Sequence, residues 1–270
     1  MIELRQITFS YPSPASPVPV FRNFNFTISP GKHVAVMGPN GSGKSTLGKI
    51  VKGLLSPAEG EVRIGGVPVR KGEVSLDVGY VFSNPENQIV SSVVEEDVAF
   101  GLGNMGMEPA VMQDRVSECL RLVGMEGYRT HSPHLLSGGQ QQKVVLAGIL
   151  AMGGKILVLD EPTSMLDFED REEILDLLQA IHKGGTTVLH ITHSFEEALR
   201  AQELVFLEDG RISFQGPPEE FISLHPKIEE KVQLPSLYRL VIALRERGLR
   251  IPPGVFSYDE LREILSQVRP

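Results

Sequence analysis

The chain has 270 residues, of which 41% are hydrophobic and 22% charged, and its formal net charge is −8. Such a composition buries one large core, or one core with a small appendage. The acidic balance argues against a nucleic-acid partner, which needs a broad basic surface, but a mononucleotide needs only a local anion site. No apolar run approaches the roughly 18 residues that cross a bilayer, and a secretory signal pattern is missing, so we expect a cytosolic protein.

Residues 1 to 36 are predicted to form short strands. The segments "IELRQITFSY" and "FRNFNFTI" alternate apolar and polar residues, and "HVAVMG" is a short apolar run typical of a buried strand. The connection that contains Pro12, Pro14, Pro17 and Pro19 is predicted to be a loop, with a spacer as its simplest role.

The stretch "GPNGSGKST" fits the phosphate-loop pattern, because it follows a predicted strand and precedes the helical spacing of "LGKIVKGLL". Glycines let backbone amides turn toward phosphate oxygens, Lys44 can reach the β and γ phosphates of ATP, and the Ser45 hydroxyl can ligate Mg²⁺. The predicted nucleotide contacts are Gly38, Asn40, Gly41, Ser42, Gly43, Lys44, Ser45 and Thr46.

Further along, helical periodicity from about residue 92 to 153 is followed by the strand patterns "KILVLDEP", "TTVLHITH", "ELVFLEDG" and "RISFQG". Buried strands separated by helices indicate an α/β fold with a parallel sheet edged by antiparallel strands. Asp160 ends one such strand and can hold Mg²⁺, and Glu161 follows it and can polarise an attacking water. A parallel sheet presents the carboxyl ends of its strands to one crevice, so we expect both residues near the phosphate loop.

A second predicted anion site lies in "LLSGGQQQKVVLAGIL", where Ser137, Gly138 and Gly139 precede a helix. One nucleotide does not fill both phosphate sites of a single subunit. At this point the chain resembles the ATP-binding cassette (ABC) ATPases, whose signature is LSGGQ and ends here at Gln140. The resemblance covers about residues 1 to 216 and implies a P-loop fold with an antiparallel β subdomain and a helical signature subdomain. It also implies a head-to-tail dimer, in which Ser137 and Gly139 contact the γ-phosphate held by the partner's Lys44.

The resemblance assigns roles to three further residues. Tyr11 matches the aromatic residue that stacks on adenine, although an aromatic packed at a strand end is the alternative. His193 matches the switch histidine that contacts the γ-phosphate, whereas a lone histidine is more often structural. Asp167 matches the loop that links the two sites across the dimer, with an ordinary exposed turn as the alternative.

The loop in "GYVFSNPENQIV" departs from the family pattern. Most ABC ATPases end this strand with a glutamine that reaches the magnesium and the attacking water, and Ser83 stands there. Serine keeps an oxygen but lacks the reach of glutamine, so direct coordination is in doubt. Gln88 is expected to line the surface that receives the membrane subunit rather than to replace the missing glutamine.

The composition changes after Gly216, and residues 217–270 are predicted to form a helical extension that pairs subunits. Two short amphipathic helices are expected to pack on the core domain or on another subunit. The first has its apolar face at Leu237, Leu240, Val241 and Leu244. The second has capping-box spacing at Ser257 and Glu260, ahead of Leu261, Ile264, Leu265 and Val268.

The phrases "NPENQIVSSVVEEDVAFGL" and "LPSLYRLVIALRERG" resemble the ATPases of energy-coupling factor (ECF) transporters, importers of vitamins and of cobalt or nickel. That family implies two ATPase subunits, a membrane coupling subunit and a substrate-binding membrane subunit, with the ATPases on the cytoplasmic face of the membrane. A heterodimer of paralogues is favoured over a homodimer, because a partner with a complete site would tolerate Ser83.

Two other functions stay open at this point. One is a cytosolic ABC ATPase that serves assembly or nucleic-acid repair, which the acidic charge and the ECF-like tail disfavour. The other is a regulatory module that binds ATP without hydrolysing it, against which Glu161 and His193 count. An ATPase assay separates these two, and a search for partners separates the transporter from the cytosolic enzyme.

Overall fold

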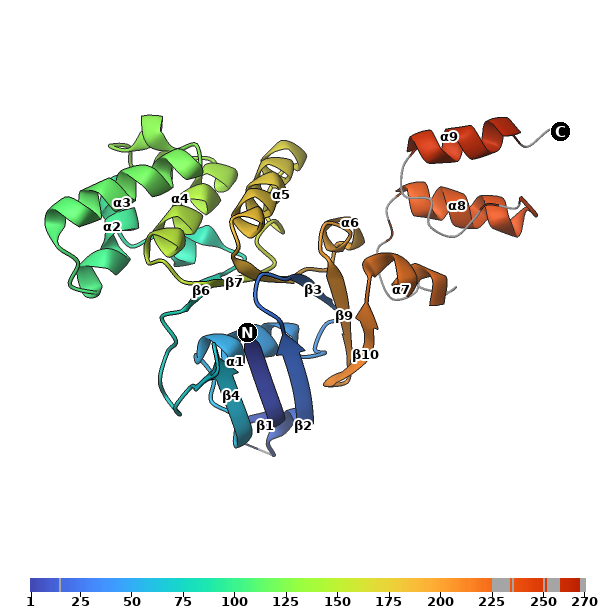
Figure 1. Ribbon diagram of the computed structural model, residues 1–270, viewed down its shortest axis with the longest axis horizontal. Coiled ribbons are helices and arrows are strands. Elements are labelled where there is room, and N and C mark those ends of the chain that lie inside the picture. The colour runs from blue at the N-terminus through green and yellow to red at the C-terminus, as the bar shows by residue number, and fades with distance from the viewer. Residues whose placement is uncertain (15, 225–233, 235, 250, 252–257, 268–270) are drawn as a thin grey trace.

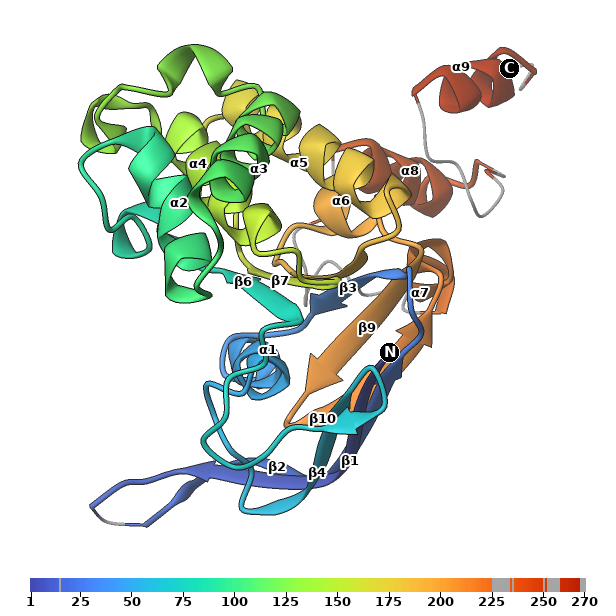
Figure 2. The same ribbon diagram turned by 60° about the vertical axis from the view of Figure 1, so that its left-hand side comes forward.

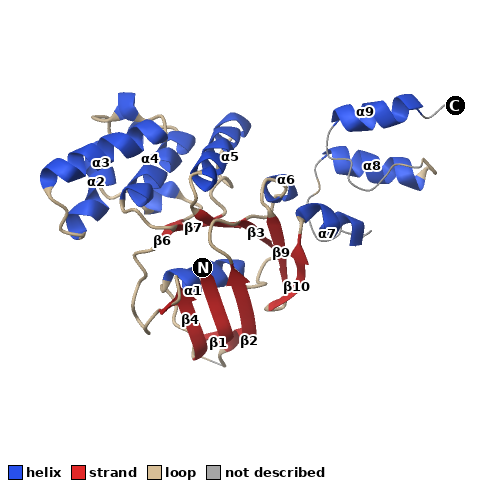
Figure 3. Ribbon diagram, viewed as in Figure 1, coloured by secondary structure: helices blue, strands red, loops and turns tan. Residues whose placement is uncertain are grey.

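The computed structural model describes residues 1–14, 16–224, 234, 236–249, 251 and 258–267. The chain forms two β-sheets with a helix between them, a group of helices on the far face of the larger sheet, and further helices at the C-terminal end (Figure 1, Figure 3). This arrangement confirms the predicted α/β class.

The larger sheet has six strands in the order β10-β9-β3-β8-β7-β6. All neighbours are parallel except β10, which pairs antiparallel with β9 at one edge, as predicted. Strands β3, β6, β7 and β8 are buried along their whole length, because helices or the second sheet cover both faces. The strands are β3 (His33–Met37), β6 (Val78–Val81), β7 (Ile156–Asp160), β8 (Thr187–Ile191), β9 (Glu203–Glu208) and β10 (Arg211–Gly216).

The smaller sheet is antiparallel, with the order β2-β1-β4-β5. The predicted proline-rich loop is shorter than expected, since β2 begins at Val18 and Pro19 already pairs with Ser10. Proline is tolerated there because β2 lies at the edge of the sheet, where one side of the strand needs no ladder donors. The strands are β1 (Ile2–Tyr11), β2 (Val18–Ile28), β4 (Glu59–Ile64) and β5 (Val67–Pro68).

Helix α1 (Lys44–Lys52) lies between the two sheets (Figure 1, Figure 2). Its apolar residues share one core cluster with strands of both sheets. Gly48 allows the close approach of helix and sheet, because a Cβ atom there would lie 3.0 Å from side-chain atoms of Ile191 and Val158. The packing therefore fixes the helix, and the loop before it, against the strand ends.

A group of helices covers the opposite face of the larger sheet (Figure 3). It includes three helices within the segment 92–153, where the sequence predicted helical structure, and α5, which follows β7. The elements are α2 (Val94–Asn104), α3 (Pro109–Leu122), α4 (Gly138–Ala151) and α5 (Phe168–Lys183), with short 3₁₀ turns η1 (Pro85–Asn87), η2 (Glu126–Tyr128) and η3 (Pro133–Leu135).

The C-terminal helices pack partly on the core and partly on one another. Phe221 of α7 (Pro218–Leu224) is fully buried beside Phe206 of β9 and Phe195 of α6 (Phe195–Ala198). Burial of this side chain contributes about 2–3 kcal/mol of hydrophobic stabilisation. In α8 (Ser236–Glu246), Tyr238 joins this cluster, whereas Leu237 and Val241 pack with Leu261 of α9 (Tyr258–Gln267).

The expected apolar face of α8 is only partly covered in one subunit. Leu237 and Val241 are buried, whereas Leu240 is 43% exposed, and its packing on another subunit stays a prediction. The predicted cap at Ser257 and the last apolar position, Val268, lie outside the described residues. Among the helices that the structure describes, none has the length and apolar character that a membrane span requires.

Candidate nucleotide site

The register of the large sheet aligns three strand ends. Ile191 of β8 pairs with Val36 of β3 on one side and with Asp160 of β7 on the other. The segments that follow these three residues therefore leave the sheet side by side at the carboxyl ends of the strands, where open α/β sheets bind their ligands. They contain the phosphate loop, Glu161 and His193.

The phosphate loop has a backbone that requires glycine. Gly38 has a φ of 149°, and a Cβ atom there would lie 2.1 Å from the carbonyl oxygen of Leu207. Gly43, with a φ of 105°, turns the chain into α1. Asn40 and Gly41 are exposed at the tip of the loop. The loop thus holds its amides at the positive end of a helix.

Two polar side chains of this loop are ready to meet an anion. The Ser42 hydroxyl is buried and has no hydrogen-bond partner among the described residues. Lys44 Nζ folds back onto the loop and donates to the carbonyl oxygens of Gly38 at 2.8 Å and Pro39 at 3.1 Å. Burial lowers the pKa of Lys44, and the nearby carboxylates of Glu161 and Asp160 oppose that shift. A phosphate group suits both side chains.

Asp160 joins three elements through its carboxylate. Its Oδ1 accepts a hydrogen bond of 2.8 Å from the Ser45 hydroxyl of α1, and its Oδ2 accepts one of 2.8 Å from the Tyr80 hydroxyl of β6. Burial, and then the negative charge of Asp160, raise the pKa of Tyr80, so the phenol stays a donor. Sequence reasoning missed Tyr80, for which the only signal was a hydroxyl in a buried strand that needs a partner.

Glu161 and His193 lie side by side at the next two strand ends. Glu161 Oε2 and His193 Nδ1 are 3.5 Å apart, and the Glu161 amide donates to the carbonyl oxygen of Ile191 at 2.9 Å. Glu161 has a φ of 52°, which is uncommon for a residue with a side chain and is held by its surroundings. Its side chain is 32% exposed and that of His193 is 58% exposed, so both face a region that solvent or substrate can enter.

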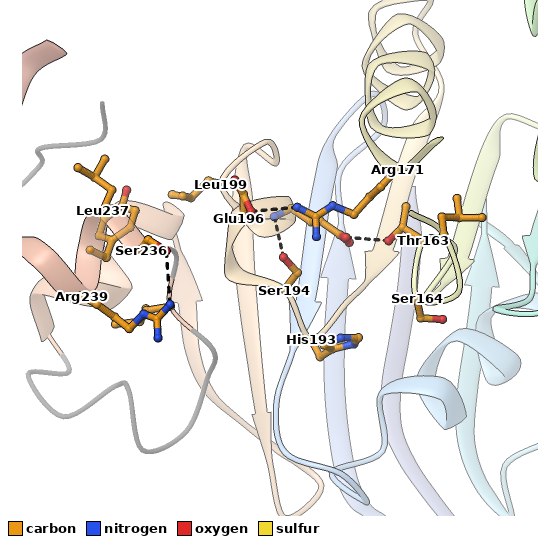
Figure 4. Close-up of a pocket in the computed structure, with 14 residues that line it drawn as sticks. Thr163, Ser164, Arg171, His193, Ser194, Glu196, Leu199, Ser236, Leu237 and Arg239 are labelled. Atoms are coloured by element: carbon orange, nitrogen blue, oxygen red, sulfur yellow. Dashed lines mark hydrogen bonds and ion pairs between the residues drawn. The ribbon is translucent and has the colours of Figure 1, made fainter. Parts of the chain in front are cut away.

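A cavity of about 530 Å³ continues from His193 toward α8. Its lining includes Thr163 and Ser164 of the loop after β7, Ser194, Arg171 of α5 and Arg239 of α8 (Figure 4). Arg171 donates to Glu196 at 3.0 Å, so its charge is already paired.

Tyr11 lies beside the start of α1. Its hydroxyl is 3.1 Å from Thr46 Oγ1, and its ring meets Phe9 edge-on with centroids 5.0 Å apart. The side of β1 that carries Tyr11 therefore borders the phosphate loop, and the residue is 36% exposed. Thr46 itself is buried at this contact.

The signature residues form the N-terminus of α4. Ser137 and Gln140 make the reciprocal hydrogen bonds of a capping box, at 3.2 and 3.0 Å. The Asp170 carboxylate lies on the same helix end and accepts from Gly139 N at 3.2 Å and from Ser137 Oγ at 3.3 Å. Gly138 begins the helix. This chain thus places its own carboxylate where the sequence predicts a phosphate.

Asp170 is held there by Asp167. The Asp167 side chain caps α5 and accepts a hydrogen bond of 2.9 Å from the Asp170 amide. Among the hydrogen bonds of the described residues, none joins the signature to the phosphate loop. The two predicted anion sites belong to different helices, since the phosphate loop leads into α1 and the signature begins α4.

The loop after β6 is closed by Gln88. Its Oε1 accepts from Phe82 N at 2.7 Å, and its Nε2 donates to the carbonyl oxygen of Tyr80 at 2.9 Å. The amide group is thus used inside the loop, and the place of Gln88 on a docking surface stays a prediction. Ser83 is half-buried, and no hydrogen bond of its hydroxyl is found in the described part of the chain.

This combination of a phosphate loop, a strand-end Asp-Glu pair and a separate signature helix defines a P-loop ATPase of the ABC type. The family model described as "ABC transporter" matches residues 21–164. The energy-coupling factor transporter ATP-binding protein EcfA1 of Clostridium novyi is 38% identical, with 100% of this chain and 99% of the relative covered. The protein of the same name from Enterococcus faecalis is 41% identical, with 96% and 94% covered.

Solved structures agree with these relatives. CbiO1 of Clostridium perfringens, described as part of the ABC transporter complex CbiONQ, is 30% identical with a TM-score of 0.76, over 91% of this chain and 98% of that one. A dimeric ATP-binding cassette with bound ADP and phosphate is 31% identical with a TM-score of 0.71, over 81% and 99%. The chain belongs to the ATP-binding proteins of ABC transporters, of the energy-coupling factor type.

The Tyr80 contact predicts an effect on magnesium. A Tyr80→Phe variant should raise the Mg²⁺ concentration for half-maximal ATP hydrolysis about tenfold, because a hydrogen bond to a charged group is worth roughly 1.5–3 kcal/mol. Nucleotide binding in EDTA should stay unchanged. Tyr128→Phe, which removes a phenol hydroxyl outside the site, is the control. An unaltered magnesium dependence in Tyr80→Phe would contradict this role.

Proposed function

We propose that this chain is the ATP-hydrolysing motor of an ECF-type importer, on the cytoplasmic face of the membrane. The observation that carries the proposal is the single sheet edge at which Lys44, Asp160, Glu161 and His193 meet. We propose a vitamin or a transition-metal ion as the transported solute, which is what the resemblance to ECF transporter ATPases implies; the relatives' names give the transporter type alone.

Phosphate and Mg²⁺ fit the residues present. Ser45 Oγ and the Asp160 carboxylate supply two oxygens that already lie 2.8 Å apart. Mg²⁺ is commonly bound by one or two such protein groups together with substrate phosphates, and when bound it neutralises phosphate charge. Among the described residues no group of three or more His, Cys, Asp or Glu side chains forms a metal site, which agrees with a site completed by ATP.

Glu161 takes the role of the base in this proposal. Its carboxylate polarises the water that attacks the γ-phosphorus, the bond to the β–γ bridging oxygen breaks, and ADP leaves. Lys44 and the loop amides stabilise the negative charge on the γ-phosphoryl oxygens and on the leaving ADP. His193, 3.5 Å from Glu161, is close enough to contact the γ-phosphate. Tyr11 stacks on the adenine in the same pose.

A second ABC ATPase subunit completes the site. The signature residues Ser137, Gly138 and Gly139 meet the nucleotide of the partner, and Asp167 lies at the junction between the two sites. Exposed apolar side chains support a contact surface here, since Leu135 is 86%, Met165 65% and Phe168 68% exposed. A paralogue is the favoured partner because of Ser83.

The loop after β6 couples the motor to membrane subunits. Gln88 makes this loop rigid, and Val90, which follows it, is 61% exposed. Phe100 of α2 is 53% exposed. A rigid loop with apolar side chains beside it suits a helix of a membrane coupling subunit, which in turn holds the substrate-binding subunit.

The role of Glu161 is tested by Glu161→Gln. The amide keeps the shape of the side chain but accepts no proton, so turnover should fall at least 100-fold while ATP binding stays within about twofold. Hydrolysis is measured as phosphate release, and binding with a fluorescent ATP analogue. Undiminished hydrolysis would remove Glu161 from this role.

Asp170 predicts how readily the subunits close. Its negative charge competes with the partner's γ-phosphate for the signature amides, so Asp170→Asn should lower the ATP concentration for half-maximal dimerisation several-fold. Dimerisation is followed by light scattering with the Glu161→Gln change in each sample, to prevent turnover. Glu169→Gln, which removes a neighbouring exposed carboxylate, should leave the concentration unchanged. An equal shift in both variants would reflect net charge alone.

The transporter assignment is tested by the partners of the protein. The tagged chain is extracted from membranes in mild detergent, and co-purifying chains are identified by mass spectrometry. We expect a multi-span coupling subunit together with a second ABC ATPase. Recovery from the soluble fraction alone, with no membrane protein, would overturn the transporter function in favour of a cytosolic ABC ATPase.

A further inference from the structure

A buried carboxylate lies directly behind the Glu161–His193 pair. Glu197 belongs to α6, the single helical turn that follows β8, and is only 3% exposed. Ser194 caps this turn and accepts a hydrogen bond of 3.4 Å from the Glu197 amide (Figure 4). Its neighbour Glu196 is exposed and pairs with Arg171 instead. The chain thus holds one of two adjacent carboxylates in the interior.

Glu197 connects the two loops that carry the reacting groups. Its Oε1 accepts a hydrogen bond of 2.7 Å from the Thr163 hydroxyl, in the loop that follows Glu161 (Figure 4). Its Oε2 accepts one of 2.7 Å from the Thr192 hydroxyl, directly before His193. Both threonines are at least nine-tenths buried.

A third side chain lies beside the Glu197 carboxylate. His190 Nε2 of β8 lies 3.3 Å from Glu197 Oε2, and the ring of His190 stacks on that of His33 with centroids 5.9 Å apart. Burial by itself raises the pKa of Glu197, but the neighbouring His190 ring and the two threonine hydroxyls lower it to about 2. The carboxylate is therefore ionised at neutral pH.

The burial of an ionised carboxylate calls for a functional explanation. Moving a charge out of water costs several kcal/mol of folding free energy, and an apolar residue of similar volume would fill the same space without that cost. The groups in front of it are loosely held: Glu161 and His193 touch at 3.5 Å and are both partly exposed. Glu161 also has the strained φ of 52°. The distance between Glu161 and His193 therefore depends on how firmly the loops that carry them are held, and Glu197 holds both loops through Thr163 and Thr192.

We propose that Glu197 is a positioning residue for ATP hydrolysis, which holds the loops of Glu161 and His193 at a fixed separation through Thr163 and Thr192. Glu197 is 3% exposed and acts through these two threonines rather than on the nucleotide itself. The proposal rests on the proposed roles of Glu161 and His193 in hydrolysis. A shift of about 1 Å in such a pair is enough to slow a reaction roughly 100-fold.

The test compares Glu197→Gln with Glu196→Gln in the full chain, assembled with the subunits that co-purify with it. The amide keeps the size of the side chain but removes its charge and turns one acceptor into a donor, so one threonine hydroxyl can no longer donate to it. We expect kcat to fall 10- to 100-fold, with the affinity for a fluorescent ATP analogue within twofold of wild type. Glu196→Gln should behave as wild type.

Isosteric threonine variants separate positioning from folding. Thr163→Val and Thr192→Val each remove one arm of the network, and each should lower kcat by less than Glu197→Gln. Combined with Glu197→Gln they should add little, because residues of one network are non-additive. These variants also carry the test if Glu197→Gln does not fold.

The outcomes distinguish the possible failures. A wild-type kcat in folded Glu197→Gln, or in both threonine variants, would overturn the positioning role. So would a loss of kcat matched by an equal loss of nucleotide affinity, which would indicate general damage to the fold. If Glu161→Gln also hydrolyses ATP normally, the proposed function itself has failed.

Discussion

The parallel pairing of β3, β8 and β7 is the constraint on which the site depends. Because Val36, Ile191 and Asp160 lie in register, three loops that are far apart in sequence start from one line across the sheet. Helix α1 then fixes the position of the phosphate loop relative to the strand ends, since the hydroxyl of Ser45 at its start donates to Asp160 at 2.8 Å. Shifting one strand by a residue would move a reacting side chain to the other face.

Much of this architecture was predictable, because its signals are local. The phosphate loop, the Asp-Glu pair and the signature each lie in a short segment whose spacing reveals its chemistry, and the α/β class follows from apolar strands that alternate with helices. The ECF resemblance likewise depended on short segments. Relatives that cover the whole chain confirm the family.

The contacts that join these segments were not predictable. Tyr80 reaches Asp160 across 80 positions, Thr163 reaches Glu197 across 34, and Ser137 reaches Asp170 across 33. In the sequence, Glu196 and Glu197 are equivalent acidic residues of a helix start, where either favours the helix dipole. Only the packing of α6 makes one of them buried. The hydrogen bonds of Gln88 within its loop were not predictable for a related reason, since a polar residue in a loop can bond backbone groups inside it as readily as face a partner.

Groups of the chain itself make hydrogen bonds at both of its predicted anion sites. Lys44 donates to carbonyl oxygens of the phosphate loop, and the signature amide of Gly139 donates to Asp170. In the proposed head-to-tail dimer, nucleotide replaces the first set of contacts and the partner's phosphate replaces the second. The two replacements occur on different subunits, so neither nucleotide binding nor association alone exchanges all of these hydrogen bonds. Such an arrangement makes closure depend on nucleotide and partner together, which is what a motor needs if hydrolysis is to be confined to the assembled transporter.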